Sequence, residues 1–238
     1  MRQKKSLGQH FLTNPKIHEH IVEAAEIKPG EMVVEIGPGS GLLTDHLLAA
    51  GARVIAVEKD TEFVKNLREK YKNKNIEIIE ADVLNFKLLN FKLSNYKLVG
   101  NLPYYLTSHL LRIILQEWPQ PKCIVFMVQK EVAKRMTAKP PRMNMLAVLV
   151  QSYAEPKIIK IVKAGNFSPP PKVDSAIVKL VPLSTTHYSL LPLAAQGFAH
   201  PRKKLANNLP IELLENAGID PNRRAETLTL DEWKKLSS

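Results

Sequence analysis

The chain has 238 residues, of which 45% are hydrophobic and 24% are charged, values typical of a globular protein that exclude a disordered or fibrous one. Lysine and arginine number 34 against 23 acidic residues, and the resulting net charge of +11 favours nucleic acid or an acidic membrane surface as partner. Cys123 is the only cysteine, which excludes a disulfide framework and a thiolate zinc cluster, and we expect no metal site.

The N-terminal segment is basic and leads into Gly8-Gln9-His10 instead of an apolar signal core. No apolar run reaches the length of about 18 residues that a membrane-spanning helix needs. We therefore expect a cytoplasmic protein without a membrane partner. Asn14-Pro15 is typical of a helix N-cap and first helical position, and the apolar spacing that follows predicts a helix over about residues 15–26.

Strands and helices then alternate as far as residue 130. The hydrophobic pattern predicts strands at 32–36, 53–58, 76–80, 97–101 and 122–129, and helices at 42–50, 61–72 and 107–117. This order predicts a parallel sheet covered by helices on both faces, which binds ligands at the carboxyl ends of its strands. Two more extended segments are expected near 157–163 and 173–181.

The pattern changes after Pro182. Residues 184–238 contain no strand-like run, only short helical stretches separated by proline and glycine. Thr229 and Glu232 have the spacing of a capping box for a last short helix. We therefore predict a sheet domain over residues 1–183 and a small all-helical C-terminal domain over 184–238.

The positive charge is clustered along the chain. Residues 122–163 carry nine basic and two acidic side chains, residues 1–20 carry four and one, and residues 167–238 carry nine and seven. Such clustering is typical of a binding face, although a solvated helix face can have the same composition.

Glycines at positions 37, 39 and 41 directly follow a predicted strand and precede a predicted helix. Glycine permits tight turns and a close approach of a ligand to the backbone. An ordinary turn between a strand and a helix can contain the same pattern of glycines. Leu42 stands where a dinucleotide fingerprint has its third glycine, and no P-loop lysine follows. The loop therefore favours a nucleoside over a diphosphate.

Two carboxylates end the next two predicted strands. Glu58 lies 21 positions after Gly37, close to the spacing at which an acidic residue binds a ribose diol. Asp82 follows the third strand and could accept a hydrogen bond from an adenine amine. The alternatives are an ion pair with the adjacent Lys59 for Glu58 and a turn cap for Asp82. Together with the glycine loop, they predict an adenosine site.

Asn101-Leu102-Pro103-Tyr104 follows the fourth predicted strand. Pro103 restricts Leu102 to an extended conformation that directs its carbonyl outward, while Asn101 offers a neutral acceptor and Tyr104 an aromatic face. A flipped base needs acceptors for its exocyclic amine and a stacking platform. The motif is also compatible with an ordinary turn, and the neighbouring adenosine site favours the functional interpretation.

Five ordered motifs resemble the ribosomal RNA adenine N6,N6-dimethyltransferase family. They are Lys5-Ser6-Leu7-Gly8-Gln9-His10-Phe11-Leu12, Glu35-Ile36-Gly37-Pro38-Gly39-Ser40-Gly41-Leu42-Leu43-Thr44, Asn101-Leu102-Pro103-Tyr104, Gln129-Lys130-Glu131-Val132-Ala133 and Phe167-Ser168-Pro169-Pro170-Pro171-Lys172-Val173-Asp174-Ser175-Ala176. The first and fourth motifs are more similar to the small-subunit, kasugamycin-resistance branch than to the large-subunit, macrolide-resistance branch. The run that begins at Phe167 is similar in both.

The resemblance implies a Rossmann-like S-adenosylmethionine methyltransferase that dimethylates adenosines near the 3′ end of small-subunit (16S) ribosomal RNA. It implies that His10, Leu12 and Gly37 border the cofactor, that Glu58 binds the ribose, that Asp82 binds the adenine and that Asn101 lies between cofactor and substrate. The substrate amine would bond to Asn101 and the Leu102 carbonyl, and Tyr104 and Phe167 would stack on the flipped base.

We expect the RNA to be bound by basic residues near the middle of the chain and in its C-terminal part, namely Lys130, Lys134, Arg135, Arg202 and Lys203. The expected partner is the small ribosomal subunit, and nothing in the sequence requires more than a monomer. The alternatives are an adenine methyltransferase for large-subunit RNA or for DNA, a ribosome-assembly binding factor and a small-molecule methyltransferase. The basic segment 122–163 disfavours the last of these.

Overall fold

A computed structural model of the protein describes residues 11–91, 93–102, 106–184 and 188–237. By its internal packing the chain divides into two compact units, one of residues up to Ala133 with Lys157–Pro182, the other of Lys134–Pro156 with residues from Leu183 onward. The second unit thus includes residues 134–156, which the sequence analysis placed in the first domain. The division into a sheet domain over residues 1–183 and an all-helical domain over residues 184–238 stays a prediction.

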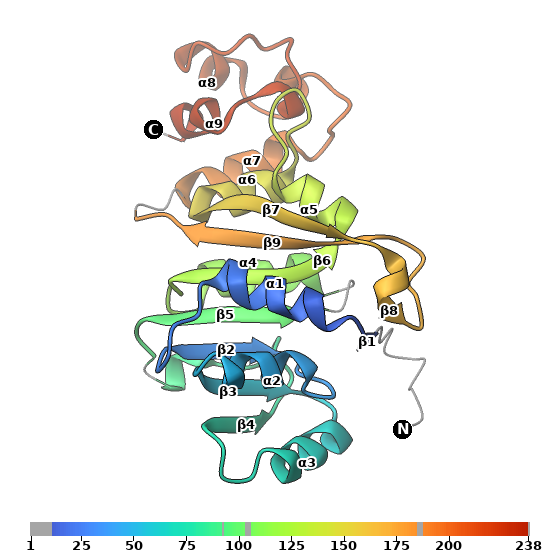
Figure 1. The fold of residues 1–238 in the computed structure, drawn as a ribbon. Helices are drawn as coiled ribbons and strands as arrows, with labels where there is room; N and C mark the ends of the chain where they lie inside the picture. The colour runs from blue at the N-terminus through green and yellow to red at the C-terminus, as the bar shows by residue number, and fades with distance from the viewer. Residues whose placement is uncertain (1–10, 92, 103–105, 185–187, 238) are drawn as a thin grey trace. The chain divides into compact units, whose positions relative to one another are not determined.

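A seven-stranded sheet with the order β4-β3-β2-β5-β6-β9-β7 forms the centre of the fold (Figure 1). Its strands are β2 (Met32–Ile36), β3 (Arg53–Glu58), β4 (Ile76–Glu80), β5 (Tyr96–Asn101), β6 (Cys123–Gln129), β7 (Ala154–Val162) and β9 (Ser175–Pro182). The strands β2 to β6 pair in parallel, which confirms the expected parallel sheet, and β9 pairs with β6 in the antiparallel direction.

Helices cover both faces of the parallel part of this sheet. They are α1 (Pro15–Ala25), α2 (Leu42–Ala49), α3 (Thr61–Lys70) and α4 (Thr107–Gln116). In Figure 1, α1 and α2 lie in front of the sheet and α4 lies behind it. Ile21 of α1 and Leu47 of α2 belong to one buried core cluster with Val33 and Val99 of the strands. Because strand side chains alternate between faces, Val34 and Leu98 are buried on the other side.

Sequence signals at the helix ends agree with the structure. Asn14 caps α1, its side chain accepting a hydrogen bond from the Lys16 amide at 3.1 Å, and Pro15 is the first helical residue. Gly51, just beyond α2, has φ +81°, which a glycine adopts without strain. A second, two-stranded sheet pairs β1 (Phe11–Leu12) with β8 (Phe167–Ser168) and was not expected from the sequence.

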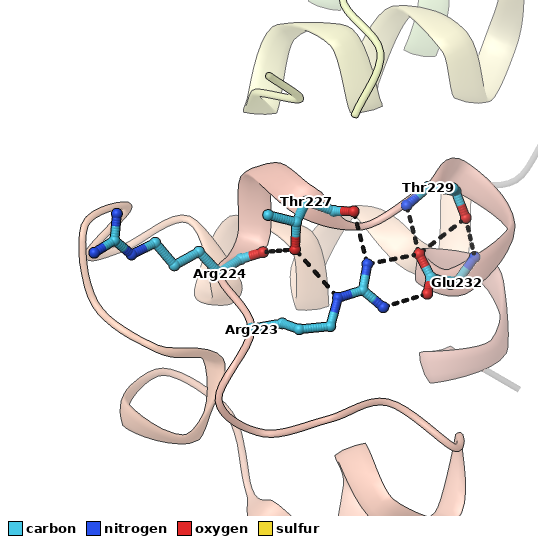
Figure 2. A network of polar contacts seen from close by, with 5 residues as sticks. All are labelled: Arg223, Arg224, Thr227, Thr229 and Glu232. Atoms are coloured by element: carbon cyan, nitrogen blue, oxygen red, sulfur yellow. Dashed lines mark hydrogen bonds and ion pairs between the residues drawn. The ribbon is translucent and has the colours of Figure 1, made fainter. Parts of the chain in front are cut away.

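The second compact unit is helical. It contains α6 (Met145–Tyr153), α7 (Leu191–Gly197), α8 (Ile211–Asn216) and α9 (Leu230–Leu236), together with the end of α5 (Lys130–Met136). Short 3-10 turns are η4 (Tyr188–Leu190), η5 (Leu205–Asn207) and η6 (Ala225–Thr227) in this unit, and η2 (Leu88–Phe91) and η3 (Ala164–Asn166) in the first. Trp233 of α9 is fully buried. The expected capping box of Thr229 and Glu232 is present, and Arg223 joins it (Figure 2).

Among the described residues, no helix is both long enough and apolar enough to cross a membrane.

Candidate functional site

The topological switch point of the sheet lies between β2 and β5. From β2 the chain passes outward to β3 and β4, then returns to β5 on the other side of β2. The loops after β2 and β5 therefore leave in opposite directions, and open α/β sheets bind ligands in the crevice outside such strand ends. In the register of the sheet, Ile36 lies beside Val57 and Gly100, so the residues that follow these three positions meet at one edge.

The glycine loop after β2 supplies backbone at this edge. Gly37, Gly39 and Gly41 have φ values of +66°, +54° and +82°, a region that favours glycine. The Gly37 amide donates to the Val57 carbonyl at 2.9 Å, and among the described residues other than its two chain neighbours, no atom lies within 4 Å of the place where a Cβ at Gly37 would be. This backbone is compatible with the close approach of a flat ligand, and a cofactor contact of Gly37 stays a prediction.

Glu58 is held at the end of β3 by three backbone amides. Its Oε2 accepts from Gly39 at 3.1 Å, and its Oε1 accepts from Lys59 at 2.8 Å and from Asp60 at 2.9 Å. Only 8% of Glu58 is exposed. A carboxylate has about four acceptor positions, so the contacts with described residues leave Oε2 capacity for a ribose hydroxyl. The Glu58 side chain is thus already oriented beside the glycine loop before a ligand binds.

Asp82 follows β4 and is paired with Lys59. The Lys59 Nζ lies 2.6 Å from Asp82 Oδ2, and this ammonium holds the pKa of Asp82 below its usual range. Asp82 Oδ1 also accepts from the Leu84 amide at 3.1 Å, which is a turn cap. Lys59 thus forms an ion pair with Asp82, and its backbone amide donates to Glu58. A role of Asp82 at an adenine stays a prediction.

Asn101 is the last residue of β5 and lies opposite Met127 of β6. The Leu102 amide donates to the Met127 carbonyl at 3.1 Å, which fixes the backbone at the start of the Asn-Leu-Pro-Tyr motif. A Cβ at Gly100 would come within 2.7 Å of the Ile36 carbonyl oxygen, so only glycine lets β5 lie this close to β2. Pro103 and Tyr104 lie outside the described residues, and their roles stay predictions.

Leu12 and Phe167 come together in the small β1–β8 sheet, where they are register partners. Both are buried, with 3% and 4% exposed, in the core cluster that includes α1. A stacking role for Phe167 requires one face of its ring to reach the substrate, and it stays a prediction. His10 lies outside the described residues.

Glu35 has a buried environment that was not predicted from the sequence. This residue is 1% exposed in the middle of β2, and Thr44 Oγ1 donates to its Oε2 at 2.6 Å. Burial raises the pKa of Glu35 to about 8, so the carboxyl group is mostly protonated at neutral pH. The available signal was a charged residue inside the apolar run Met32–Ile36.

The candidate RNA-binding residues fall into both compact units. Lys134 and Arg135 of α5, and Arg202 and Lys203 before η5, are exposed. Lys130 is only partly exposed, and its Nζ lies 3.5 Å from Asp174 Oδ2. Contact with a phosphate would therefore compete with this ion pair, while the other four residues present their charge directly to solvent.

The glycine loop, the oriented Glu58 carboxylate and the carboxylate of Asp82 are a donor and acceptor set that fits the nucleoside of S-adenosylmethionine. The open space at Gly37 admits a ligand, and Glu58 can accept hydrogen bonds from a diol. Asn101 at the adjoining strand end offers a neutral amide at the same edge of the sheet.

A family model and several known proteins are similar to this chain over nearly its full length. The family model described as "Ribosomal RNA adenine dimethylase" matches residues 1–237. The "Ribosomal RNA small subunit methyltransferase A" of Dehalococcoides mccartyi is 43% identical over 99% of the chain and 88% of its own length. The protein of the same name from Clostridium botulinum is 40% identical over 98% of the chain and 92% of its own length.

Two solved structures are similar in fold and sequence. A dimethyladenosine transferase from Plasmodium falciparum has a TM-score of 0.82 and 28% identity, with 95% of this chain and 96% of that one covered. The 23S rRNA methyltransferase ErmE has a TM-score of 0.76 and 29% identity, with 95% and 97% covered.

Proposed function

The chain belongs to the ribosomal RNA adenine dimethylase family, and we propose that it dimethylates the N6 amines of two adjacent adenosines near the 3′ end of small-subunit (16S) ribosomal RNA. The methyl donor is S-adenosylmethionine. The names of the two bacterial relatives support the small-subunit substrate. The large-subunit substrate named for ErmE is the alternative within the family.

The position of Asn101 carries this proposal. Asn101 follows Gly100, the register partner of Ile36, while the cofactor loop begins at Gly37 on the neighbouring strand. An amine bound to Asn101 would therefore lie beside the cofactor. Proximity of this kind can contribute up to about 7–11 kcal/mol to lowering a barrier.

The chemistry needs acceptors and no strong base. S-adenosylmethionine supplies a methyl group that is already strongly electrophilic. An adenine amine is a poor nucleophile because its lone pair is delocalised into the ring. The Asn101 amide oxygen and the Leu102 carbonyl, as acceptors, draw the amine hydrogens out of the ring plane and make the lone pair available. Asn101 stays neutral, so the amine proton can leave after methyl transfer.

The remaining roles complete the proposed site. His10 and Leu12 border the cofactor, Gly37 approaches it through its backbone, Glu58 binds the ribose and Asp82 the adenine. Tyr104 and Phe167 stack on the flipped base, and Pro103 makes the turn between Leu102 and Tyr104 rigid.

We also propose that the RNA is held by the basic side chains of Lys130, Lys134, Arg135, Arg202 and Lys203. Contacts of lysine and arginine with phosphate supply much of the affinity for nucleic acid. The protein acts as a monomer in the cytoplasm, on the small subunit during its assembly. A ribosome-assembly factor without catalysis is the alternative of another class, and the Asn-Leu-Pro-Tyr motif favours an enzyme.

Methyl transfer by an Asn101→Ala variant tests the proposal. We expect transfer of labelled methyl groups to small-subunit RNA to fall by at least about 100-fold, because the amine loses its alignment. RNA binding should persist. Asn75→Ala is the matched control, because Asn75 is exposed and precedes β4 at the opposite end of the strands. Turnover by Asn101→Ala at the rate of the control would contradict the role given to Asn101.

A further inference from the structure

The small sheet of β1 and β8 needs support from outside itself. Each strand has two residues, and an isolated two-stranded pair is marginally stable at best. Yet Leu12 and Phe167 are buried to the level of the main core. Other contacts must therefore hold the chain around residues 11–14 against the segment that precedes Phe167.

Asn166 makes those contacts. Its carbonyl oxygen accepts from the Thr13 amide at 2.9 Å and from Thr13 Oγ1 at 3.0 Å. Its side-chain Oδ1 accepts from Asn14 Nδ2 at 2.8 Å, and its own Nδ2 donates to the Lys163 carbonyl at 2.9 Å. One residue thus bonds to two consecutive residues that lie about 150 positions earlier in the chain.

The partner side chain has two tasks. Asn14 Oδ1 caps helix α1 by accepting from the Lys16 amide at 3.1 Å, while Asn14 Nδ2 reaches Asn166. The same side chain therefore joins the start of α1 to the start of β8. A residue that caps the helix without an amide nitrogen would keep the first task and lose the second.

Asp174 fixes the other side of this turn to the sheet. Its Oδ1 accepts from the Ala164 amide at 3.3 Å, and its Oδ2 lies 3.1 Å from Lys163 Nζ. The Asp174 carbonyl accepts from the Lys130 amide at 3.0 Å, directly after β6. The turn that carries Asn166 is thus attached to the carboxyl end of a central strand.

We propose that Asn166 is a positioning residue for the methyltransferase, which with Asn14 holds residues 11–14 at the edge of the sheet where the cofactor is proposed to bind. The inference rests on the proposed function, in which Leu12 and His10 border S-adenosylmethionine. The pair fixes the backbone at residues 12–14 before the cofactor binds. Without it, binding must order this segment, and cofactor affinity falls.

Asn14→Ser and Asn166→Ala test the pair. Serine is a good N-cap, so Asn14→Ser keeps the cap on α1, and Asn166→Ala keeps the backbone bonds to Thr13. Each variant should weaken S-adenosylmethionine binding by about fivefold in calorimetry, the effect of one lost neutral hydrogen bond. The double variant should be no more than about twofold weaker than Asn166→Ala alone, because both substitutions remove the Asn14–Asn166 contact and Asn166→Ala already includes the loss of the bond to the Lys163 carbonyl.

Asn144→Ser is the matched control. Asn144 also caps a helix through its side chain, here α6, and its Nδ2 also donates to a carbonyl, that of Arg135. A role in folding alone would lower the melting temperature of Asn14→Ser and Asn144→Ser alike and leave cofactor affinity unchanged in both. We expect weaker binding only for Asn14→Ser, with faster amide hydrogen exchange at Thr13.

Unchanged cofactor affinity in both single variants, or fully additive losses in the double variant, would overturn the inference. Failure of the unmodified protein to bind S-adenosylmethionine would instead overturn the proposed cofactor site. The two failures are therefore distinguishable in one set of titrations.

Discussion

Glu58 can be tested by removing one charge without changing its size. All three amides that orient this side chain point at carboxylate oxygens, from Gly39, Lys59 and Asp60. In Glu58→Gln the orientation that opposes the fewest donors places the NH₂ group at the Oε2 position, where it faces the Gly39 amide and replaces the acceptor for the ribose. Hydrogen bonds to charged groups contribute about 1.5–3 kcal/mol, so calorimetry should show binding of S-adenosylmethionine weakened at least about tenfold.

Glu80→Gln is the control for Glu58. Glu80 is the register partner of Glu58 on β4, but it is exposed and bonds to Thr61 Oγ1. Its substitution should leave cofactor affinity unchanged. Equal affinities for Glu58→Gln and Glu80→Gln would contradict the ribose contact.

Glu35 predicts a pH dependence of stability. Burial raises its pKa from 4.5 to about 8, so between these values the folded state keeps a proton that the unfolded state releases. The free energy of unfolding should therefore fall as the pH rises through this window, by at most about 1.4 kcal/mol per pH unit. Glu35→Gln does not titrate, so its urea unfolding should lack this slope and it should be the more stable protein at pH 8.

The exposed Glu77 of β4 provides the matched substitution, Glu77→Gln. Its pH profile should follow that of the unmodified protein. A profile of Glu35→Gln that retains the same loss of stability between pH 5 and pH 8 would show that another group is responsible.

At the residue scale, the sequence predicted which side chains end the strands but not what surrounds them. Glu58 and Asp82 were identified by position alone, because the carboxyl ends of parallel strands meet at one edge. The pairing of Lys59 with Asp82 and of Thr44 with Glu35 depends on packing between elements far apart in sequence. Short sequence patterns cannot predict such contacts, because the partners are far apart in the sequence.

At the element scale, the end of the helical unit depends on one arginine. Figure 2 shows the Arg223 guanidinium against both carboxylate oxygens of Glu232, with further bonds to the Thr227 carbonyl at 2.7 Å and to Thr227 Oγ1 at 3.2 Å. Glu232 also accepts from the Thr229 amide at 2.7 Å and completes the capping box of α9. The same carboxylate thus caps the helix and ties it to the preceding turn.

Arg223→Lys should destabilise the protein by about 1–2 kcal/mol at neutral pH, because a lysine cannot replace the planar set of donors. The Arg223 guanidinium lowers the pKa of Glu232 from 4.5 to about 2. The stabilisation is therefore present above pH 4.5 and is lost as the pH falls through 2. Urea unfolding at both pH values measures the difference between the two proteins, which should shrink in acid.

Arg224→Lys is the neighbouring control. The Arg224 side chain is exposed and points away from the network, which uses only its carbonyl (Figure 2). Equal losses of stability for Arg223→Lys and Arg224→Lys would contradict a specific role of the Arg223–Glu232 contact.

Elements with a clear hydrophobic period could be predicted, and others could not. The predicted strands at 32–36, 53–58 and 76–80 have the same bounds in the structure, because each short run is soon followed by a polar or turn-forming residue: Gly37, Lys59 and, one position after Ala81, Asp82. Helix α6 was missed, because Met145–Tyr153 is apolar on most sides and shows little periodicity. The β1–β8 pair was not predicted, because strands of two residues are too short to show an alternation of apolar and polar residues.

At the scale of the whole molecule, the second compact unit carries more net positive charge than the C-terminal domain predicted from the sequence. Residues 134–156 contribute four basic and one acidic side chain, and residues 183–238 contribute seven and six, so the second unit carries +4. From the sequence, the C-terminal part was expected to be nearly balanced. The segment that adds the charge includes Lys134 and Arg135, which we propose to bind RNA.

The substrate itself is the central claim, and a single methylation experiment tests it. The protein would be incubated with labelled S-adenosylmethionine and either small subunits, large subunits or naked 16S RNA, all lacking the modification, with Asn101→Ala as the inactive control. Mass mapping of the products should find two adjacent adenosines near the 3′ end of small-subunit RNA, each with two N6 methyl groups. Methylation confined to large-subunit RNA, or no transfer to any of the three substrates, would contradict the account.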